Sequence, residues 1–153
     1  MQKNFIKLEI TDLQKFHPIN KSKIKKLVAG VLKAEKEGEN AELSVVFVDN
    51  KRMKEINRTF LRHNYATDVL SFPYQGHSLK NNINGEIIIS VEMAAKLAQK
   101  RGYSIEGEVA LYLVHGLLHL IGYDDKQKRD AKKMHQREGE LLSNFGYRVP
   151  LPN

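Results

Sequence analysis

The feature that most constrains the fold is an apolar run from Val109 to Tyr123. Apart from tyrosine hydroxyls, its only polar side chains are two histidines, His115 and His119. Residues four apart on a helix share one face, so the two imidazoles are expected about 6 Å apart. A helix that is apolar on nearly all sides has to lie inside its domain. Gly122 then supplies a residue that readily adopts the positive φ at which helices end.

The chain can turn back at Gly122 and bring two aspartates toward the histidines, in the pattern H-x3-H-x2-G-x2-D. Zinc accepts imidazole nitrogen and carboxylate oxygen at about 2.0–2.2 Å, and catalytic sites leave a fourth position for water. We therefore predict one zinc ion per chain, bound by His115, His119 and Asp125, with Asp124 as the alternative third ligand. The competing interpretation is two core histidines, but each buried imidazole would then need its own partner.

The same histidine spacing occurs in the metal helix of metzincin proteases. Their pattern is H-E-x-x-H, in which glutamate acts as the general base. Here Gly116 occupies the glutamate position. A metalloprotease therefore remains an alternative that the sequence disfavours.

Three blocks of the chain resemble the YbeY family of bacterial metal-dependent endoribonucleases, which mature ribosomal RNA. The block at 115–124, His-Gly-Leu-Leu-His-Leu-Ile-Gly-Tyr-Asp, is similar to the family signature. The blocks at 67–73, Thr-Asp-Val-Leu-Ser-Phe-Pro, and 85–90, Gly-Glu-Ile-Ile-Ile-Ser, support it. All three occur in the family order, and together they span residues 67–124.

The chain departs from the family pattern at two positions. The family usually has a third histidine where Asp125 stands, a mild change because aspartate also binds zinc. It usually has arginine six residues before the threonine of the second block, where this chain has Leu61, with Arg62 beside it. The resemblance implies a zinc-dependent, single-strand-specific endoribonuclease with His115, His119 and Arg62 as catalytic residues.

The resemblance also implies where RNA binds. Arg62 and His63 are expected to bind phosphate, because the family's strand at 67–72 lies beside the metal cleft. Three cations that follow the histidine motif are expected to hold the RNA backbone by charge. These cations are Lys126, Lys128 and Arg129. The implied partners are single-stranded RNA, ribosomal RNA and ribosomal subunits, and the implied roles are ribosomal RNA maturation and ribosome quality control.

A further alternative is a ribosome-assembly factor that binds RNA and whose metal is structural. A closed structural site would need a fourth protein ligand. Neither Asp124 nor His135 is clearly placed to supply one, and the sequence leaves this alternative open. The general base is not identifiable from the sequence.

Composition agrees with one RNA-binding domain over residues 1–153. This length can bury a proper core, and the net charge of +7 favours a polyanionic partner. There is no cysteine, so zinc has to use histidine and carboxylate ligands. No apolar run approaches the ~20 residues of a membrane span, and the N-terminus has no secretory pattern. We expect a cytoplasmic protein, with a monomer favoured.

Periodicity predicts an α+β domain, in which a mixed four-stranded sheet packs with about five helices and the histidines lie on a central helix. Strands are expected at 3–10, 41–48, 67–72 and 86–90. Helices are expected from a cap at Asn20 or Ser22 to about 37, from Asp49 or Asn50 to about 61, at 91–101, from a cap at Ser104 to Gly122, and at 126–145. Residues 75–84 are expected to form a loop.

Two groups of charged side chains are expected to be structural or solvated. The lysines of the helix that begins near residue 20 fall mostly on its outer face, where solvation is favoured over RNA contact. Glu108 shares the histidine face, but it lies about 10 Å from His115 along the helix axis. Glu108 is therefore expected to serve as N-terminal helix charge or in a surface pair.

Overall fold

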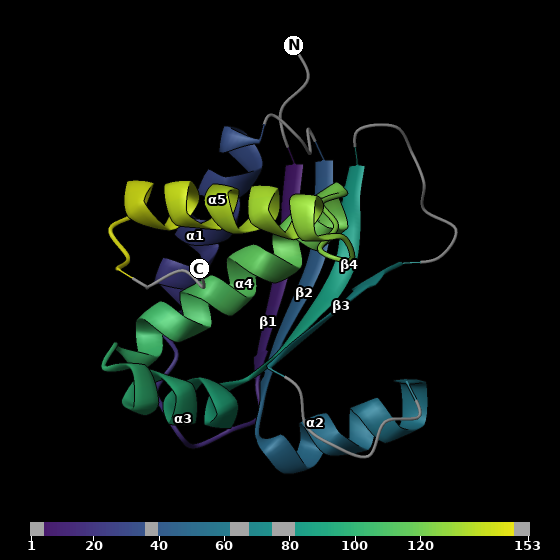
Figure 1. The fold of residues 1–153 in the computed structure, drawn as a ribbon. Helices are drawn as coiled ribbons and strands as arrows, with labels where there is room; N and C mark the ends of the chain where they lie inside the picture. Colours follow the sequence, from purple (N-terminus) through teal and green to yellow (C-terminus); the bar gives the residue numbers. More distant parts are fainter. Residues whose placement is uncertain (1–4, 36–39, 62–67, 75–81, 149–153) are drawn as a thin grey trace.

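The computed structural model describes residues 5–35, 40–61, 68–74 and 82–148. Figure 1 shows one sheet with helices packed against it. The strands are β1 (Phe5–Asp12), β2 (Asn40–Val48), β3 (Val69–Pro73) and β4 (Asn82–Ser90). The helices are α1 (Lys21–Ala34), α2 (Asn50–Ile56), α3 (Val91–Arg101), α4 (Ile105–Ile121) and α5 (Lys128–Asn144), with a π-helical turn (Asn57–Leu61) directly after α2.

The strands run in the order β1-β2-β4-β3. β1 pairs with β2 and β2 with β4 in parallel, whereas β3 and β4 are antiparallel. Parallel neighbours need a crossover connection, which α1 provides between β1 and β2. The predicted α+β domain with a mixed four-stranded sheet and five helices is confirmed.

Side-chain caps fix the starts of the helices close to where the sequence predicts them. Asn20 accepts a hydrogen bond from the Lys23 amide and caps α1, so Asn20 rather than Ser22 is the cap. Asp49 caps α2. Ser104 caps α4 as predicted, through the Gly107 amide.

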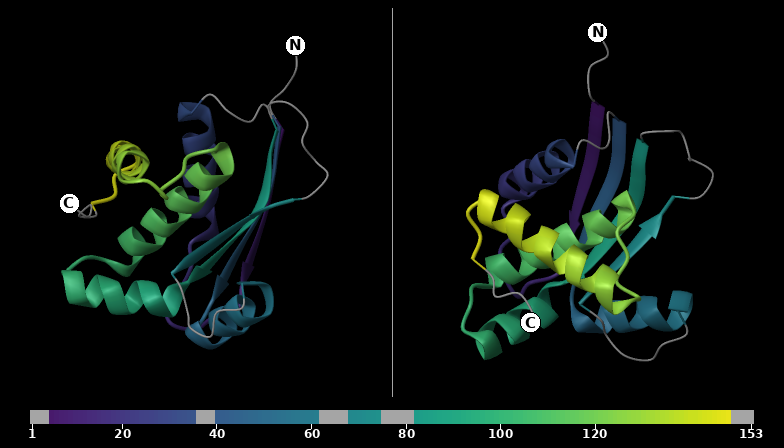
Figure 2. Two further views of the ribbon diagram at one scale, coloured as in Figure 1. Left: turned by 45° about the vertical axis from the view of Figure 1, so that its right-hand side comes forward. Right: turned by 45° about the horizontal axis from the view of Figure 1, so that its top comes forward.

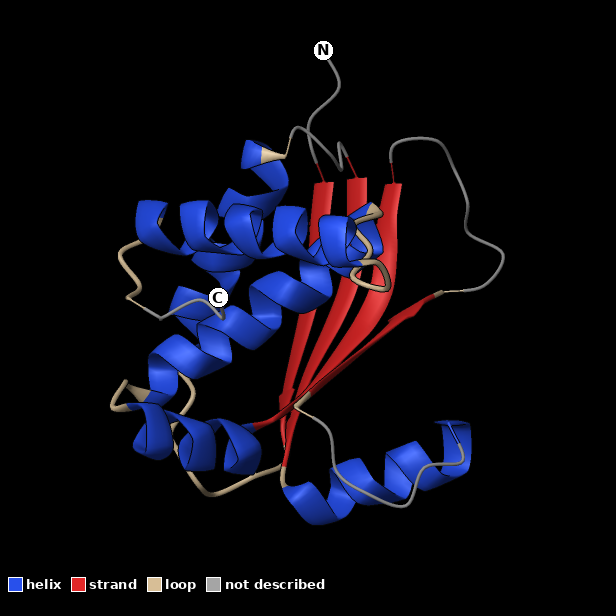
Figure 3. Ribbon diagram, viewed as in Figure 1, coloured by secondary structure: helices blue, strands red, loops and turns tan. Residues whose placement is uncertain are grey.

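Successive side chains of a strand point to opposite sides of the sheet. The main core buries one side, and a smaller cluster with α2 covers part of the other, where Lys7 and Glu42 stay exposed. On β2, Val45 and Phe47 enter the main core with α1, α4 and α5. Val48, one residue on, faces the other way and packs with Met53 of α2 and Ile88 of β4. The views in Figures 2 and 3 show α1, α4 and α5 on one side of the strands.

α4 is the central helix, as predicted, and it approaches the sheet very closely. A Cβ atom at Gly116 would lie 2.8 Å from Cγ2 of Ile87 on β4, closer than real contacts allow. The Ser71 hydroxyl of β3 donates to the Gly116 carbonyl at 3.0 Å. Glycine therefore lets the histidine-bearing part of α4 sit directly on β3 and β4.

Three local expectations need correction. β4 begins at Asn82 rather than near 86, so the expected loop at 75–84 is too long; its residues 75–81 lie outside the described part. The strand expected at 67–72 begins at Val69 and includes Pro73, because β3 is an edge strand, where the missing N–H of proline costs no sheet hydrogen bond. Glu108 is fully buried and accepts a hydrogen bond from Arg101 Nη1 at 3.2 Å, so its pair is not a surface pair.

Within the described residues, no helix combines the length and apolar character that crossing a bilayer requires.

Candidate metal centre

The end of α4 and the turn that follows it bring three potential ligands together. His115 and His119 lie one turn apart, and their Nε2 atoms are 3.1 Å from each other. The helix ends at Ile121, and Gly122, its C-cap, has a φ of 122° that allows the chain to fold back. Asp125 returns so that its Oδ2 atom lies 3.6 Å from each Nε2. These three side chains form a group that could hold a metal ion.

The opposite nitrogen of each imidazole already has a partner. Nδ1 of His115 lies 2.8 Å from Oε1 of Glu138, and Nδ1 of His119 lies 3.1 Å from the carbonyl oxygen of Tyr123. A carboxylate and a carbonyl accept hydrogen bonds, so each Nδ1 carries the hydrogen and donates it. Both Nε2 atoms are then left with free lone pairs. Hydrogen-bond partners on the far side of the ring orient metal-binding histidines in this way.

The separations of the donor atoms suit a small tetrahedral cation. Four ligands at about 2.0–2.1 Å from a tetrahedral ion lie about 3.3–3.4 Å from one another. The three separations here are 3.1, 3.6 and 3.6 Å. With both imidazoles neutral, two lone pairs and a carboxylate face one another, an arrangement that a bound cation stabilises. The donor set therefore fits zinc or a similar divalent ion.

The electrostatic environment also favours a cation. Burial lowers the pKa of His115 and is the largest single cause, but the hydrogen bond and negative charge of Glu138 oppose it by raising the pKa. Asp125 and Asp68 raise it further, so the pKa of His115 lies above its ordinary value. Carboxylates surround the imidazole on several sides and stabilise positive charge at this point.

The histidines line a cleft of about 500 Å³ between β3 and α4. One wall includes Ser71 of β3 and Asp68, which directly precedes that strand, and the α4 wall includes Gly116 and both histidines. The side chains of His119 and Asp125 are 29% and 39% exposed, so solvent and substrate can reach the donor atoms.

Comparison with known proteins identifies the family. Residues 9–146 match the family model described as Endoribonuclease YbeY. The chain belongs to the YbeY family of endoribonucleases.

Relatives named Endoribonuclease YbeY share most of their length with this chain. The protein of Caldicellulosiruptor bescii is 38% identical over 134 residues, which cover 80% of this chain and 85% of that protein. The protein of Bacillus mycoides is 38% identical over 135 residues, covering 82% and 86%. A solution structure of a Thermotoga maritima protein has the same fold, with a TM-score of 0.61, 22% identity, and coverage of 92% and 91%.

The structure describes only some of the residues expected to form the site of this YbeY family member. His115, His119 and Asp125 come together. Asp124, the alternative ligand, instead accepts a hydrogen bond from the Lys126 amide at 3.1 Å and shapes the turn. Arg62 and His63 lie outside the described residues. The three cations expected to bind RNA are exposed, beside Asp125 and at the start of α5: Lys126, Lys128 and Arg129.

Sequence reasoning missed Glu138. Its carboxylate is only 1% exposed, and its second oxygen lies 3.3 Å from Nδ1 of His135. The signal was the spacing along α5, because Glu138 falls on the same face as Met134 and Leu141, whose apolar side chains predict burial. An acid on a buried helix face needs a partner, and His115 is that partner.

A second set of contacts holds the turn after α4. The Tyr123 hydroxyl donates to Oε2 of Glu35 at 3.0 Å, and Arg137 donates through Nε to the other oxygen of Glu35. Since the Tyr123 carbonyl accepts the hydrogen of His119 Nδ1, this link between the turn, Glu35 and α5 also orients His119.

Proposed function

We propose that this protein is a zinc-dependent, single-strand-specific endoribonuclease that acts in ribosomal RNA maturation and ribosome quality control. Membership of the YbeY family supports RNA cleavage and a role in ribosomal RNA processing. The strand preference, the zinc ion and the part in quality control go beyond that membership. Its partners would be ribosomal RNA and ribosomal subunits, approached by a monomer.

The observation that carries the proposal is the triangle of donor atoms at the end of α4. Nε2 of His115, Nε2 of His119 and Oδ2 of Asp125 would hold one zinc ion. Three protein ligands leave a position open, as in catalytic rather than structural zinc sites. When bound, zinc supplies an activated water at neutral pH and stabilises negative charge on a phosphoryl oxygen.

The chain's own residues would orient the ligands and bind the substrate. Glu138 keeps the hydrogen of His115 on Nδ1, so Nε2 stays available. The Tyr123 carbonyl does the same for His119. Arg62 and His63 would bind phosphate beside the cleft, with Arg62 in the catalytic role. The exposed cations Lys126, Lys128 and Arg129 would attract the RNA backbone.

The alternatives are less well supported. A protease of the metzincin type needs glutamate at the position of Gly116, where even one methyl group would meet Ile87. A structural metal would need a fourth protein ligand, yet Asp124 bonds to the Lys126 amide and His135 to Glu138. Neither observation favours an assembly factor without catalysis.

The test compares one ribosomal RNA precursor fragment as a single strand and annealed to its complement. We expect the wild type to cleave only the single strand. The folded variant His119→Ala should be inactive, whereas His17→Ala, a histidine outside the site, should remain active. Cleavage by folded His119→Ala at the wild-type rate would overturn the proposed site. Equal cleavage of the duplex would overturn the strand preference.

A further inference from the structure

A second large cavity lies toward the other end of α4. Its volume is about 780 Å³, larger than the metal cleft. Three segments form its walls: the first turns of α1, the α3–α4 connection and the chain after α5. The side chains that line it include Lys23, Lys26, Tyr103, Phe145 and Arg148.

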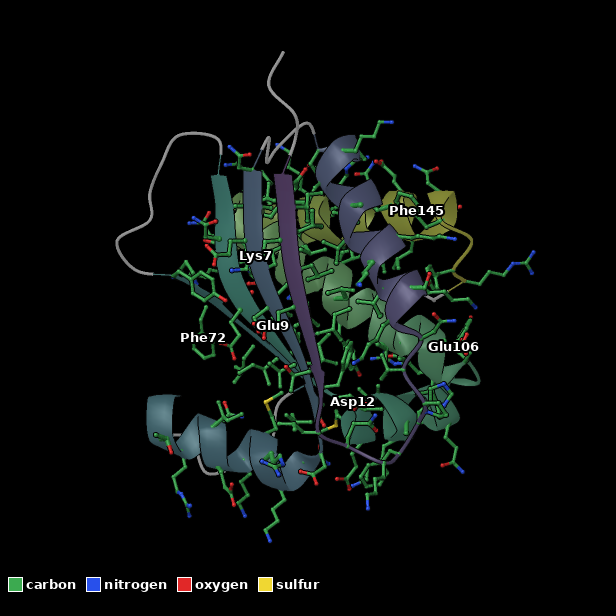
Figure 4. All side chains as sticks on the ribbon, turned by 180° about the vertical axis from the view of Figure 1, so that it is seen from behind. Lys7, Glu9, Asp12, Phe72, Glu106 and Phe145 are labelled. Atoms are coloured by element: carbon green, nitrogen blue, oxygen red, sulfur yellow. The ribbon has the colours of Figure 1, made fainter. Side chains whose placement is uncertain are left out.

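This cavity is separate from the metal centre. Ser104, which lines it, precedes His115 by 11 residues, or about 16 Å along α4. The two cavities share no lining residue. Figure 4 shows Phe145 beside α1, on the opposite side of the molecule from Phe72 of β3, the strand that borders the metal cleft.

The lining of the cavity is positively charged. Lys23, Lys26 and Arg148 line it with one acid, Glu106, so three positive charges and one negative charge leave a net charge of +2. Among the described residues, none of the three cations has a carboxylate within ion-pair distance. Glu106 already has a neighbour, because its Oε1 lies 3.7 Å from Nε2 of His17.

The cavity also displays aromatic rings. Tyr103 is 39% exposed and Phe145 is 38% exposed; they are two of the five large hydrophobic side chains that are exposed in the described part of the chain. The Phe145 ring rests on Gly30, where a Cβ atom would lie 2.3 Å from the ring. The ring is therefore held in place by α1. Exposed aromatic surface concentrated in one cavity is typical of a binding site.

We propose that this cavity is a second binding site for single-stranded RNA, distinct from the site of cleavage. Bases stack on Tyr103 and Phe145, and phosphates contact Lys23, Lys26 and Arg148. Aromatic platforms combined with a cationic groove are how proteins hold single strands without reading sequence. The proposal rests on the proposed function, since it gives the same RNA substrate a second contact. An acidic peptide would use the cations but would gain nothing from base stacking.

The first experiment measures binding of a long oligouridylate to metal-stripped protein, so that cleavage does not interfere. The charge reversals Lys23→Glu and Lys26→Glu together should weaken binding at least tenfold. They should also reduce the steepness of the plot of log binding constant against log salt concentration by about 1.4. Each single-strand phosphate that a lysine neutralises contributes about 0.7 to this slope. The matched control reverses Lys25 and Lys33, which are exposed on α1 but do not line the cavity. Equal weakening by both pairs would overturn the site.

The second experiment tests stacking. Tyr103→Ala should weaken oligouridylate binding about fivefold or more, since each stacked base contributes measurably. Tyr103→Phe keeps the ring and should bind as the wild type does. Phe16→Ala, at another exposed ring that does not line the cavity, is the control. Unchanged binding by Tyr103→Ala would overturn RNA recognition. It would also be overturned if polyglutamate displaced the bound RNA as effectively as unlabelled RNA does.

Cleavage kinetics separate this inference from the proposed function. With long single strands, the reversal of Lys23 and Lys26 should raise KM and leave kcat unchanged. If the protein cleaves RNA but KM does not change, the cavity site is wrong and the nuclease function stands. If the cavity variants weaken RNA binding but the wild type cleaves nothing, the site stands and the proposed function is wrong.

Discussion

Glu138 is the residue on which the geometry of the candidate metal centre most depends outside the ligands. Its buried carboxylate joins α5 to α4 through a 2.8 Å hydrogen bond to His115. The charge of the carboxylate raises the basicity of the imidazole, and its position fixes the tautomer. His135, 33% exposed, contacts the other oxygen and connects the pair to the surface.

The variant Glu138→Gln tests this role. Glutamine keeps the shape of the side chain but removes the charge, so zinc affinity should fall about 10- to 100-fold. A competition titration with a chromophoric chelator measures this. Glu55→Gln, at an exposed position on α2, should bind zinc as the wild type does. Wild-type affinity in Glu138→Gln would mean that the hydrogen bond only supports packing.

The third ligand is tested at Asp125. Asp125→Asn should weaken zinc binding because the charged oxygen donor is removed. Asp125→His should retain binding, since imidazole is an equally good zinc ligand. Asp124→Asn should leave the affinity unchanged, because its carboxylate accepts from the Lys126 amide. The same titration applies, and a larger drop in affinity for Asp124→Asn than for Asp125→Asn would exchange the two assignments.

At the scale of elements, the sequence of α4 predicts its position and its metal-binding face, whereas its contacts depend on the neighbouring elements. Its apolar sequence predicts a central helix, and its histidine spacing predicts a metal face, because both are properties of one continuous segment. The role of Glu138 was not predictable in the same way, since it depends on α5 packing across α4. The close contact of Gly116 with Ile87 likewise exists only once β4 lies beneath the helix.

Gly116→Ala tests the close packing of α4 on β4. At an unhindered helix position, replacing glycine by alanine stabilises by up to about 1 kcal/mol. Here the new Cβ would lie 2.8 Å from Ile87, so the free energy of unfolding should fall by about 1–3 kcal/mol. Urea denaturation measures the change, with Lys132→Ala as an exposed control on α5. A stabilised Gly116→Ala variant would show that the helix shifts at no cost.

The start of α5 is expected to act through charge alone. Reversing Lys126, Lys128 and Arg129 to glutamate should make the plot of log binding constant for single-strand RNA against log salt concentration less steep by about 2. Each phosphate contact contributes about 0.7 to this slope. Reversal of three exposed cations on α2, on the other face of the sheet, should change the slope much less. These control positions are Lys51, Arg52 and Lys54. Equal slopes in both triple variants would mean that the α5 cations are only solvated.

At the scale of the whole molecule, periodicity predicts the helices and strands well. The sheet order is less accessible, because pairing of β2 with β4 joins segments separated by a helix and a strand. The sequence likewise makes the lysines of α1 look like a uniform solvated face. Two of them, Lys23 and Lys26, line a cavity with the distant Tyr103 and Phe145, which only the folded chain brings together.

The central claim is that one zinc ion, held by His115, His119 and Asp125, is required for cleavage of single-stranded RNA. The most direct test is the cleavage rate of metal-stripped protein as zinc is added back. We predict no cleavage without metal, a rise that saturates at one zinc per chain, and no recovery in folded His119→Ala. Full cleavage by the stripped wild type, or equal recovery in His119→Ala, would contradict the account.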